Sequence, residues 1–329
     1  MTIRYKNVYI NETSTITGPY EQKGPLNNYF DKSYDDLYFK QPTWEQAESK
    51  LIEESVDLLL LKIGKTRFDI DLFISGDLLN QITASNYAAS RLGIPFLGVY
   101  SACASSVEGL IVGANMIESK MIKNCITSVS SHNNAAEKQF RYPVEYGGPK
   151  PKTATITATG SASAYLSYNK ANIKVDSATI GTVQDLGIKD AFHMGAVMAP
   201  AAAHTLYQHL KDTKREIGYY DLILTGDLGD YGKQILIDFM QTEYNITLKN
   251  YEDTGCLLYD PESEDRMAGG SGPACAPLVT YSYIFEKMRK KEYQHVLLIA
   301  TGALMSPTMV NQKLSIPSIA HAISLEAIE

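Results

Sequence analysis

The sequence predicts an α/β protein built from two similar halves, because short apolar strands alternate with helical segments and two signatures each occur twice. The first signature is a strand that ends in a Gly-Asp turn: Asp71–Leu78 reads DLFISGDL and Asp221–Leu228 reads DLILTGDL. The second is Ala-Cys-Ala, centred on Cys103 and on Cys275. A duplicated pattern constrains the architecture more firmly than local propensity does.

Each signature opens a unit of secondary structure. A helical stretch follows each Gly-Asp turn, at Leu79–Leu92 with Gly93 as its cap and at about Lys233–Tyr244. Each Ala-Cys-Ala begins another helix that leads into an apolar strand. Alternation of this kind indicates parallel strands whose faces are covered by helices.

The spacing of the signatures locates an insertion. The Gly-Asp turns are 150 residues apart (221 − 71) and the cysteines 172 (275 − 103), so the second half is longer by 22 residues within Asn245–Gly272. The charged run Glu262–Arg266 in that segment is expected to be a solvated loop. Thr153–Tyr168 has period-two character and predicts a hairpin. We therefore expect halves of residues 1–170 and 171–329.

The composition excludes several classes of protein. Apolar residues make up 44% of the chain, which suits a buried core. Thirty Lys and Arg against 37 Asp and Glu, with no basic cluster, argue against a nucleic-acid partner. The start has no apolar core of signal-peptide length, and nowhere do 18 apolar residues run together, so we expect neither a signal peptide nor a transmembrane segment.

Metal and cofactor motifs are also missing from the sequence. The four cysteines include no CxxC pair, and no His lies at metal-ligand spacing from them. The glycine run at 269–272 has neither the Lys-Ser/Thr of a phosphate loop nor the spacing of a dinucleotide fingerprint. We expect reduced thiols, no metal site and no cofactor.

Cys103 is the first candidate for chemistry. It lies between a strand and a long helix, so its thiol should lie among the unpaired N–H groups of the first helical turn. Such a terminus can stabilise a thiolate or hold an anion. A small cysteine that packs a strand-to-helix turn is the alternative interpretation.

This position resembles the reactive cysteine of the thiolase superfamily. The resemblance implies a duplicated five-layer α/β/α/β/α fold, a functional Cys103 and a structural Cys275. Decarboxylating condensing enzymes of the family also use a His and an Asn from the second half. The matching turns here read LTGDLG, which contains Asp227, and GGSGP, which contains the candidate ligand residue Ser271. Neither turn contains the His or the Asn, so we expect no thiolase-type catalysis, and an acidic Asp227 beside the cysteine would further disfavour a thiolate.

Four further residues are candidate ligand contacts. His193 could face the pocket, or it could simply begin a helix. His132 follows a strand of the first half, where loops should face the pocket mouth. Asp77 and Asp227 could contact a ligand, alone or through calcium, although capping of the Gly-Asp turns would also explain them. Two other histidines are expected to be exposed, His204 and His209.

A closer resemblance covers nearly the whole chain. The N-terminal third contains GPL, FDK, YDDLY and WE, and later segments read YSACASS, MAPAAA and TGDLG. Together they resemble the stage V sporulation AD proteins of spore-forming bacteria. The resemblance implies a non-catalytic protein that binds dipicolinic acid (pyridine-2,6-dicarboxylate), alone or as its calcium chelate, for uptake into the developing spore. The dianion would be held by the helix amides at a neutral Cys103 thiol, with a charge-assisted bond from His193.

The resemblance also implies partners and a location. We expect integral membrane proteins of the same sporulation channel as partners and a peripheral position on the inner membrane of the forespore or spore. A homodimer through the sheet edge of the first half follows by analogy with thiolase folds. Two alternatives stay open: a thiolase or 3-ketoacyl synthase-type acyltransferase that uses Cys103 with His193 as an unconventional base, and a structural scaffold of the channel.

Overall fold

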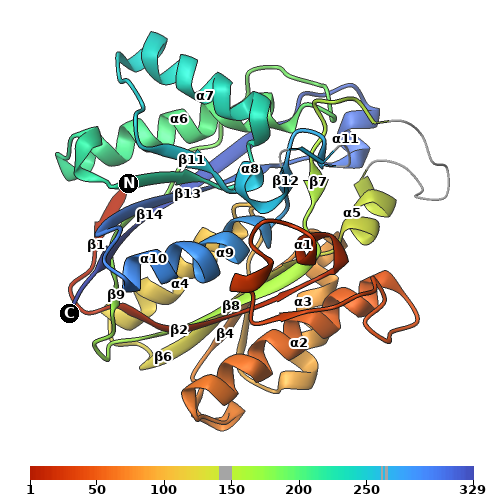
Figure 1. Ribbon diagram of the computed structural model, residues 1–329, viewed down its shortest axis with the longest axis vertical. Coiled ribbons are helices and arrows are strands. Elements are labelled where there is room, and N and C mark those ends of the chain that lie inside the picture. Colours follow the sequence, from red (N-terminus) through yellow and green to blue (C-terminus); the bar gives the residue numbers. More distant parts are fainter. Residues whose placement is uncertain (141–149, 261, 264–265) are drawn as a thin grey trace.

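A computed structural model describes residues 1–140, 150–260, 262–263 and 266–329. Two half-sheets alternate with three layers of helices (Figure 1). One outer layer consists of α2 (Trp44–Ile63) and α3 (Thr83–Leu92), and the other of α6 (Met194–Thr213) and α7 (Gly229–Tyr244). The middle layer contains α4 (Ser105–Glu118), α9 (Cys275–Val279), a π-helical turn at Thr280–Ile284 and α10 (Phe285–Arg289). The predicted five-layer α/β fold is confirmed.

The two half-sheets have the same strand order. The first half contains β2 (Tyr9–Thr17), β4 (Phe73–Gly76), β5 (Phe96–Gly98), β6 (Asn124–Ser131) and β8 (Gly160–Ser167). The second contains β9 (Ile173–Thr179), β10 (Leu222–Thr225), β11 (Tyr251–Asp253), β13 (His295–Ala303) and β14 (Ser318–Ala327). Numbered one to five along the chain, both halves run 3-2-4-5-1 across the sheet.

Strand direction repeats as well as strand order. In each half the second, third and fourth strands along the chain run parallel to one another. The fifth strand pairs antiparallel with the fourth. A short antiparallel contact between β2 and β9 joins the halves into one sheet. The expected division near residue 170 falls in the connection between β8 and β9.

Shorter elements complete the fold. β1 (Thr2–Arg4) pairs with β9, β3 (Lys32–Ser33) pairs with β2, and β7 (Ile156–Thr157) pairs with β12 (Gly270–Ser271). The short helices are α1 (Pro19–Gln22), α5 (Asn133–Phe140), α8 (Thr254–Leu258) and α11 (Pro307–Asn311). Within the described ranges, no helix combines the length and the apolar character needed to cross a membrane.

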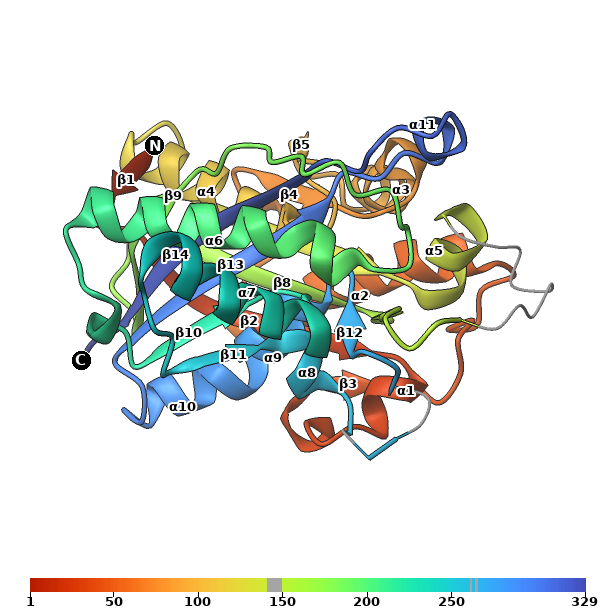
Figure 2. The same cartoon turned by 90° about the horizontal axis from the view of Figure 1, so that it is seen from above.

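The middle helix α4 explains why its own sequence is apolar almost all round. It packs on β4 and β6 of the first half and on β13 and β14 of the second, so it is enclosed by two sheets (Figure 1). Seen from above, α6 of the outer layer lies across β13 and β14 (Figure 2). A helix buried on both sides cannot keep a polar face. Gly113 lets it approach the first sheet closely, because a Cβ there would lie 2.6 Å from the Cys125 sulfur.

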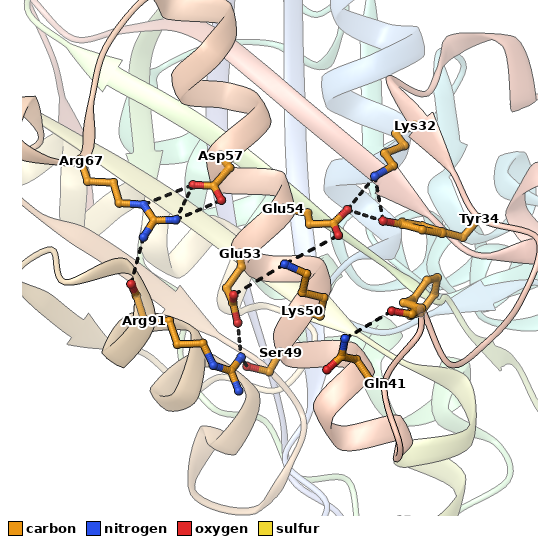
Figure 3. Close-up of polar contacts among 11 residues, drawn as sticks. Lys32, Tyr34, Gln41, Ser49, Lys50, Glu53, Glu54, Asp57, Arg67 and Arg91 are labelled. Atoms are coloured by element: carbon orange, nitrogen blue, oxygen red, sulfur yellow. Dashed lines mark hydrogen bonds and ion pairs between the residues drawn. The ribbon is translucent and has the colours of Figure 1, made fainter.

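The outer helix α2 is held by caps and charged contacts. The Thr43 hydroxyl accepts from the Gln46 amide at its start, and Gly64 ends it in the left-handed conformation. On its solvent side Glu54 pairs with Lys32 at 2.7 Å, and Arg67 forks onto Asp57 at 2.7 and 3.0 Å (Figure 3). Exposed pairs of this kind each stabilise a fold by about 1 kcal/mol or less, so they orient the segments around α2 more than they stabilise them.

The structure corrects the predicted hairpin at Thr153–Tyr168. β8 pairs with β6 and β2, whereas β7 leaves the main sheet and pairs in parallel with β12 of the other half. Side chains alternate with a period of two in a hairpin and in two strands that pair elsewhere. The sequence pattern therefore identifies the strands but not the strands with which they pair.

Other local predictions also need correction. The stretch expected to be helical from Leu79 begins as a 3₁₀ turn with positive φ at Gln81 and Ile82, and α3 starts at Thr83, although Gly93 caps it as predicted. α7 starts one turn earlier than expected, at Gly229.

Two polar residues expected to be exposed are buried. His209 is fully buried between Thr179 and Tyr220, to which it hydrogen-bonds. Arg266, placed in the solvated charge cluster, is buried against Asp230 at 2.6 Å, while residues 264 and 265 of that cluster lie outside the described residues.

The crossing of α6 and α7 depends on two facing glycines, Gly195 and Gly232. A Cβ on Gly195 would lie 2.4 Å from the Leu228 carbonyl oxygen and 2.9 Å from the Gly232 Cα, both backbone atoms. Gly195→Ala should therefore lower the free energy of unfolding by about 1–3 kcal/mol, the usual cost of overpacking. Chemical denaturation measures this. Gly218→Ala is the matched control, because nothing lies within 4 Å of its Cβ position, and equal loss in both variants would contradict the account.

Candidate functional site

A pocket opens at the carboxyl ends of β4 and β10, where the two halves meet. Its empty volume is about 540 Å³, part of which is open to solvent. Of the predicted site residues, Cys103, Asp227 and Ser271 line it together. Ligand sites are commonly found at such junctions between parallel strands and helix termini.

The Cys103 turn is held tightly from both halves. Ala102 has φ +50°, a strained conformation for a residue with a side chain, and the Ser105 hydroxyl bridges the Ser101 amide at 2.9 Å and the Ala102 carbonyl at 2.8 Å. From the second half, the Nε2 atom of His321 in β14 lies 3.5 Å from the Ser101 hydroxyl oxygen. These contacts fix the thiol at the pocket, just before the first turn of α4.

The Cys103 thiol is neutral in this setting. Burial raises the pKa of the Cys103 thiol well above its usual range, and the adjacent Asp227 carboxylate raises it further. The Gly272 amide, which would favour a thiolate, opposes this only in part. Cys275, the counterpart in the duplication, is fully buried in the core and does not line the pocket.

The two aspartates of the duplicated turns have diverged. Asp77 accepts from the Leu79 amide at 2.9 Å and the Ser85 amide at 2.8 Å, so it caps its turn and the start of α3. In the second half Asp253 has the capping role, accepting from the Leu228 and Gly229 amides at 2.9 and 3.0 Å. Asp227 is thereby free of the turn and points into the pocket.

Asp227 has an unusual environment for a carboxyl group. It accepts from the Thr301 hydroxyl at 2.5 Å and the Gly272 amide at 3.3 Å. Burial raises the pKa of Asp227 to about 7, although these donors and the Cys103 thiol act in the opposite direction. Near neutral pH it therefore exists in both protonation states, and its protonated form can donate a hydrogen bond.

The pairing of β7 with β12 brings Thr157 and Ser271 to the same wall. Their registered pairing places both side chains along the pocket, followed by Gly272 at φ +96°. A Cβ on Gly272 would lie 2.8 Å from the Ser131 hydroxyl, so this turn requires glycine. Sequence reasoning missed Thr157 because the strand pairing that places it is between halves.

His132 and His193 do not line the pocket. His132 is fully buried, contacts the Leu37 carbonyl at 2.7 Å, and packs beside Trp44. Burial lowers the pKa of His132 to about 4. His193 is the N-cap of α6, its Nδ1 accepting from the Ala196 amide at 3.4 Å, so the helix-start interpretation describes it. With Asp77, these are the three predicted contacts that the structure does not bring to Cys103.

The rest of the lining is apolar with one more acid. Met194, Met198, Phe140 and Met305 form much of the wall, and Glu137 also lines the pocket and pairs with Lys150 at 2.9 Å. Among the described lining residues there is no Lys, Arg or His. No group of three or more His, Cys, Asp and Glu is placed to hold a metal ion in the described ranges.

The raised pKa of the Cys103 thiol predicts slow alkylation. At pH 8.5 iodoacetamide should modify Cys103 far more slowly than an ordinary cysteine, because thiolate is scarce. Asp227→Asn removes the negative charge that raises the thiol pKa, and each pKa unit restored should speed the reaction roughly tenfold. Peptide mass spectrometry reports each cysteine separately.

Asp230→Asn provides the crossed control for this experiment. Asp230 accepts from the Cys256 thiol at 3.3 Å and raises its pKa, so this variant should speed alkylation of Cys256 and leave Cys103 unchanged. Rapid modification of Cys103 in the unaltered chain would show a stabilised thiolate and contradict the assignment.

Comparisons with known proteins agree with this architecture. The family profile of stage V sporulation protein AD matches residues 1–326. Stage V sporulation protein AD of Bacillus subtilis (strain 168) is 46% identical over 319 residues, 97% of this chain and 94% of that protein.

Solved structures show the same fold at low identity. Cerulenin-bound OleA of Xanthomonas campestris has a TM-score of 0.63 at 14% identity, with 98% of each chain covered. 3-Oxoacyl-[acyl-carrier-protein] synthase III of Aquifex aeolicus VF5 has a TM-score of 0.57 at 12% identity, with 99% of each chain covered. The chain has the fold of these thiolase-like enzymes, and by its sequence it belongs to the stage V sporulation protein AD family.

Proposed function

We propose that this sporulation protein binds dipicolinate in the Cys103 pocket without chemical conversion, and serves its uptake into the developing spore. The observation that carries the proposal is the pairing of a neutral Cys103 thiol with Asp227. A thiolase-type reaction needs a thiolate and a base, whereas Asp227 raises the thiol pKa instead of lowering it. The pocket lies where this fold has its catalytic site in the enzymes, but its cysteine is a neutral thiol, which suits binding and not nucleophilic attack.

The shape and the donors of the pocket support a small planar ligand. Methionine and aromatic side chains provide adaptable apolar walls for a ring, in a pocket that is partly open to solvent. Cys103, Ser271, Thr157 and Tyr100 present S–H or O–H donors along the lining. Neutral donors of this kind can hold carboxylate oxygens without a buried cation.

The charge of the lining favours the calcium chelate over the free dianion. Asp227 and Glu137 both line the pocket; Glu137 is paired with Lys150, whereas the ionised form of Asp227 would repel a dianion. A one-to-one calcium chelate is neutral overall, and its metal would accept a carboxylate oxygen as a further ligand. We propose this form as the preferred ligand, which gives Asp227 a role that the free dianion does not.

Partners and location extend the proposal. The protein would act beside integral membrane proteins of the same sporulation channel, at the inner membrane of the forespore. A homodimer would form along β5, the edge strand of the first half, whose Leu97 is 43% exposed. An open apolar edge is a template for pairing with a second copy.

Calorimetry tests the proposed ligand. Dipicolinate with calcium should bind the full chain with measurable heat, and more tightly than dipicolinate with a chelator present. Cys103→Ile fills the pocket and should weaken binding at least about tenfold, because the ring would meet the added side chain. Cys256→Ser, outside the pocket, is the control and should bind as the unaltered chain does.

Two results would overturn the proposal. One is the absence of heat with the unaltered chain, or unchanged affinity in Cys103→Ile. The other is an acyl adduct on Cys103 after incubation with short acyl-CoA, seen by intact mass and lost in Cys103→Ala, which would favour an acyltransferase. Normal dipicolinate accumulation in spores that carry Cys103→Ile would favour a scaffold.

The proposed homodimer has its own test. Leu97→Lys places a charge on the β5 edge and should shift the chain from dimer to monomer in light scattering coupled to gel filtration. Tyr168→Lys is the control, since Tyr168 is 53% exposed and follows β8, which β4 and β6 separate from β5 in the sheet. A monomeric unaltered chain at micromolar concentration would contradict the dimer.

A further inference from the structure

A buried hydroxyl group lies directly behind the pocket, that of Thr301 in β13. Thr301 is fully buried and does not line the pocket, and its hydroxyl donates to Asp227 Oδ1 at 2.5 Å. The side chain of a β-branched residue has restricted rotamers, so the strand largely sets where this hydroxyl lies. Thr301 is therefore placed to orient the Asp227 carboxyl group without touching a ligand itself.

The bond from Thr301 to Asp227 is particular to the second half. The registers of β4 with β6 and of β10 with β13 place Ser130 beside Asp77 in the same way as they place Thr301 beside Asp227. Ser130 is also fully buried, but its hydroxyl donates to Glu48 of α2 at 2.9 Å. The two halves thus have a hydroxyl at the same position, and only that of Thr301 is bonded to the aspartate.

The outer helices explain this difference. α2 and α6 occupy corresponding places in the two outer layers, both have 20 residues, and they begin 150 residues apart (194 − 44), as the Gly-Asp turns do (Figure 1). Glu48 of α2 therefore corresponds to Met198 of α6 (198 − 48 = 150), which lines the pocket. A thioether is only a weak acceptor, so the Thr301 hydroxyl has Asp227 as its strong one.

The donors around Asp227 leave little of its carboxylate for a ligand. An ionised carboxylate has about four lone-pair positions. Thr301 occupies one on Oδ1, and the Gly272 amide, 3.3 Å away, occupies one on Oδ2. The Cys103 thiol directs a third hydrogen bond at the same carboxyl group. About one position remains, so a metal ion bound by Asp227 would be held through a single oxygen.

A single free position limits what Asp227 can bind. A bare calcium ion takes about six to eight oxygen ligands, and one carboxylate contact supplies too few of them. Within the described ranges, no group of three or more His, Cys, Asp and Glu adds to this contact. A calcium ion already chelated by dipicolinate brings part of its coordination shell with it, and one further oxygen suits it.

We infer that Thr301 is a positioning residue: it holds Asp227 so that one oxygen faces the pocket, and the preference for chelated calcium over free dipicolinate depends on this bond. The inference rests on the proposed binding of calcium dipicolinate. It adds a residue outside the pocket that sets how the ligand's metal is recognised, and it predicts that calcium alone does not bind.

Calorimetry with dipicolinate, in calcium and in a chelator, tests this role. The measured quantity is the calcium preference, the Kd in chelator divided by the Kd in calcium. Thr301→Val keeps the branched shape and removes the hydroxyl, so it should lower the calcium preference at least about tenfold, the usual scale of a lost hydrogen bond to a charged group. Its Kd in chelator should change little. Thr301→Ser restores the hydroxyl and should behave as the unaltered chain does.

Ser130→Ala is the matched control, because it removes the corresponding buried hydroxyl from the first half, where the acceptor is Glu48. Chemical denaturation should show a loss of stability in both Ser130→Ala and Thr301→Val, whereas only Thr301→Val should lose calcium preference. Circular dichroism checks folding. Thr301→Cys, with a weak S–H donor, is a second variant and should lie between Thr301→Val and Thr301→Ser.

The outcomes separate this inference from the proposed function. If the unaltered chain binds dipicolinate, unchanged calcium preference in Thr301→Val, or an equal loss in Thr301→Ser or Ser130→Ala, overturns the role of Thr301 and leaves the proposed function standing. Heat with calcium alone would show that Asp227 is not limited to one contact, and would also overturn it. Absence of dipicolinate binding by the unaltered chain overturns the proposed function and this inference with it.

Discussion

The burial of α4 between two half-sheets is the constraint on which the rest of the structure depends. Because both sheets need an apolar partner, one helix contacts both, and its amino terminus is fixed at the line where the halves meet. Cys103 precedes that terminus, so its position follows from core packing. The packing of the core therefore fixes Cys103, and the pocket residues of the second half face it.

Duplication supplied the parts of the site, and divergence made them different. The two Gly-Asp turns have nearly the same sequence, yet Asp77 binds backbone amides of its own turn and Asp227 faces a thiol. The difference comes from Asp253, which occupies the amides that Asp227 would otherwise cap. A single acidic residue from β11 therefore converted a structural aspartate into a pocket residue. Burial raises the pKa of all three carboxyl groups, those of Asp77, Asp227 and Asp253, so it is the contact with the Cys103 thiol that distinguishes Asp227.

The repeated signatures were sufficient to predict two similar halves of parallel strands covered by helices, and the helix that ends at the Gly93 cap, whereas the five layers and the different roles of Cys103 and Cys275 were implied by the resemblance to the thiolase superfamily. Each signature is a short segment, and it determines only local structure: a strand, a turn and the start of a helix. The β7–β12 pairing could not be predicted, because it depends on residues more than 100 positions apart. The pocket role of Asp227 depends in the same way on Asp253, which is the N-cap of α8 and binds the amides of Leu228 and Gly229 from outside the Gly-Asp turn.

The burial of the histidines also depends on contacts with residues distant in the chain. His132 and His209 are both buried by elements distant in the chain, the segment at Leu37 and the strand β9, so their sequence neighbours do not predict their burial. Burial lowers the pKa of each to about 4, which leaves both neutral at physiological pH. The charge-assisted bond to a dianion that the resemblance implies would come from His193, which caps α6 and does not line the described pocket. The described lining offers neutral S–H and O–H donors and no cationic side chain, which is why the ligand that we propose is the neutral calcium chelate.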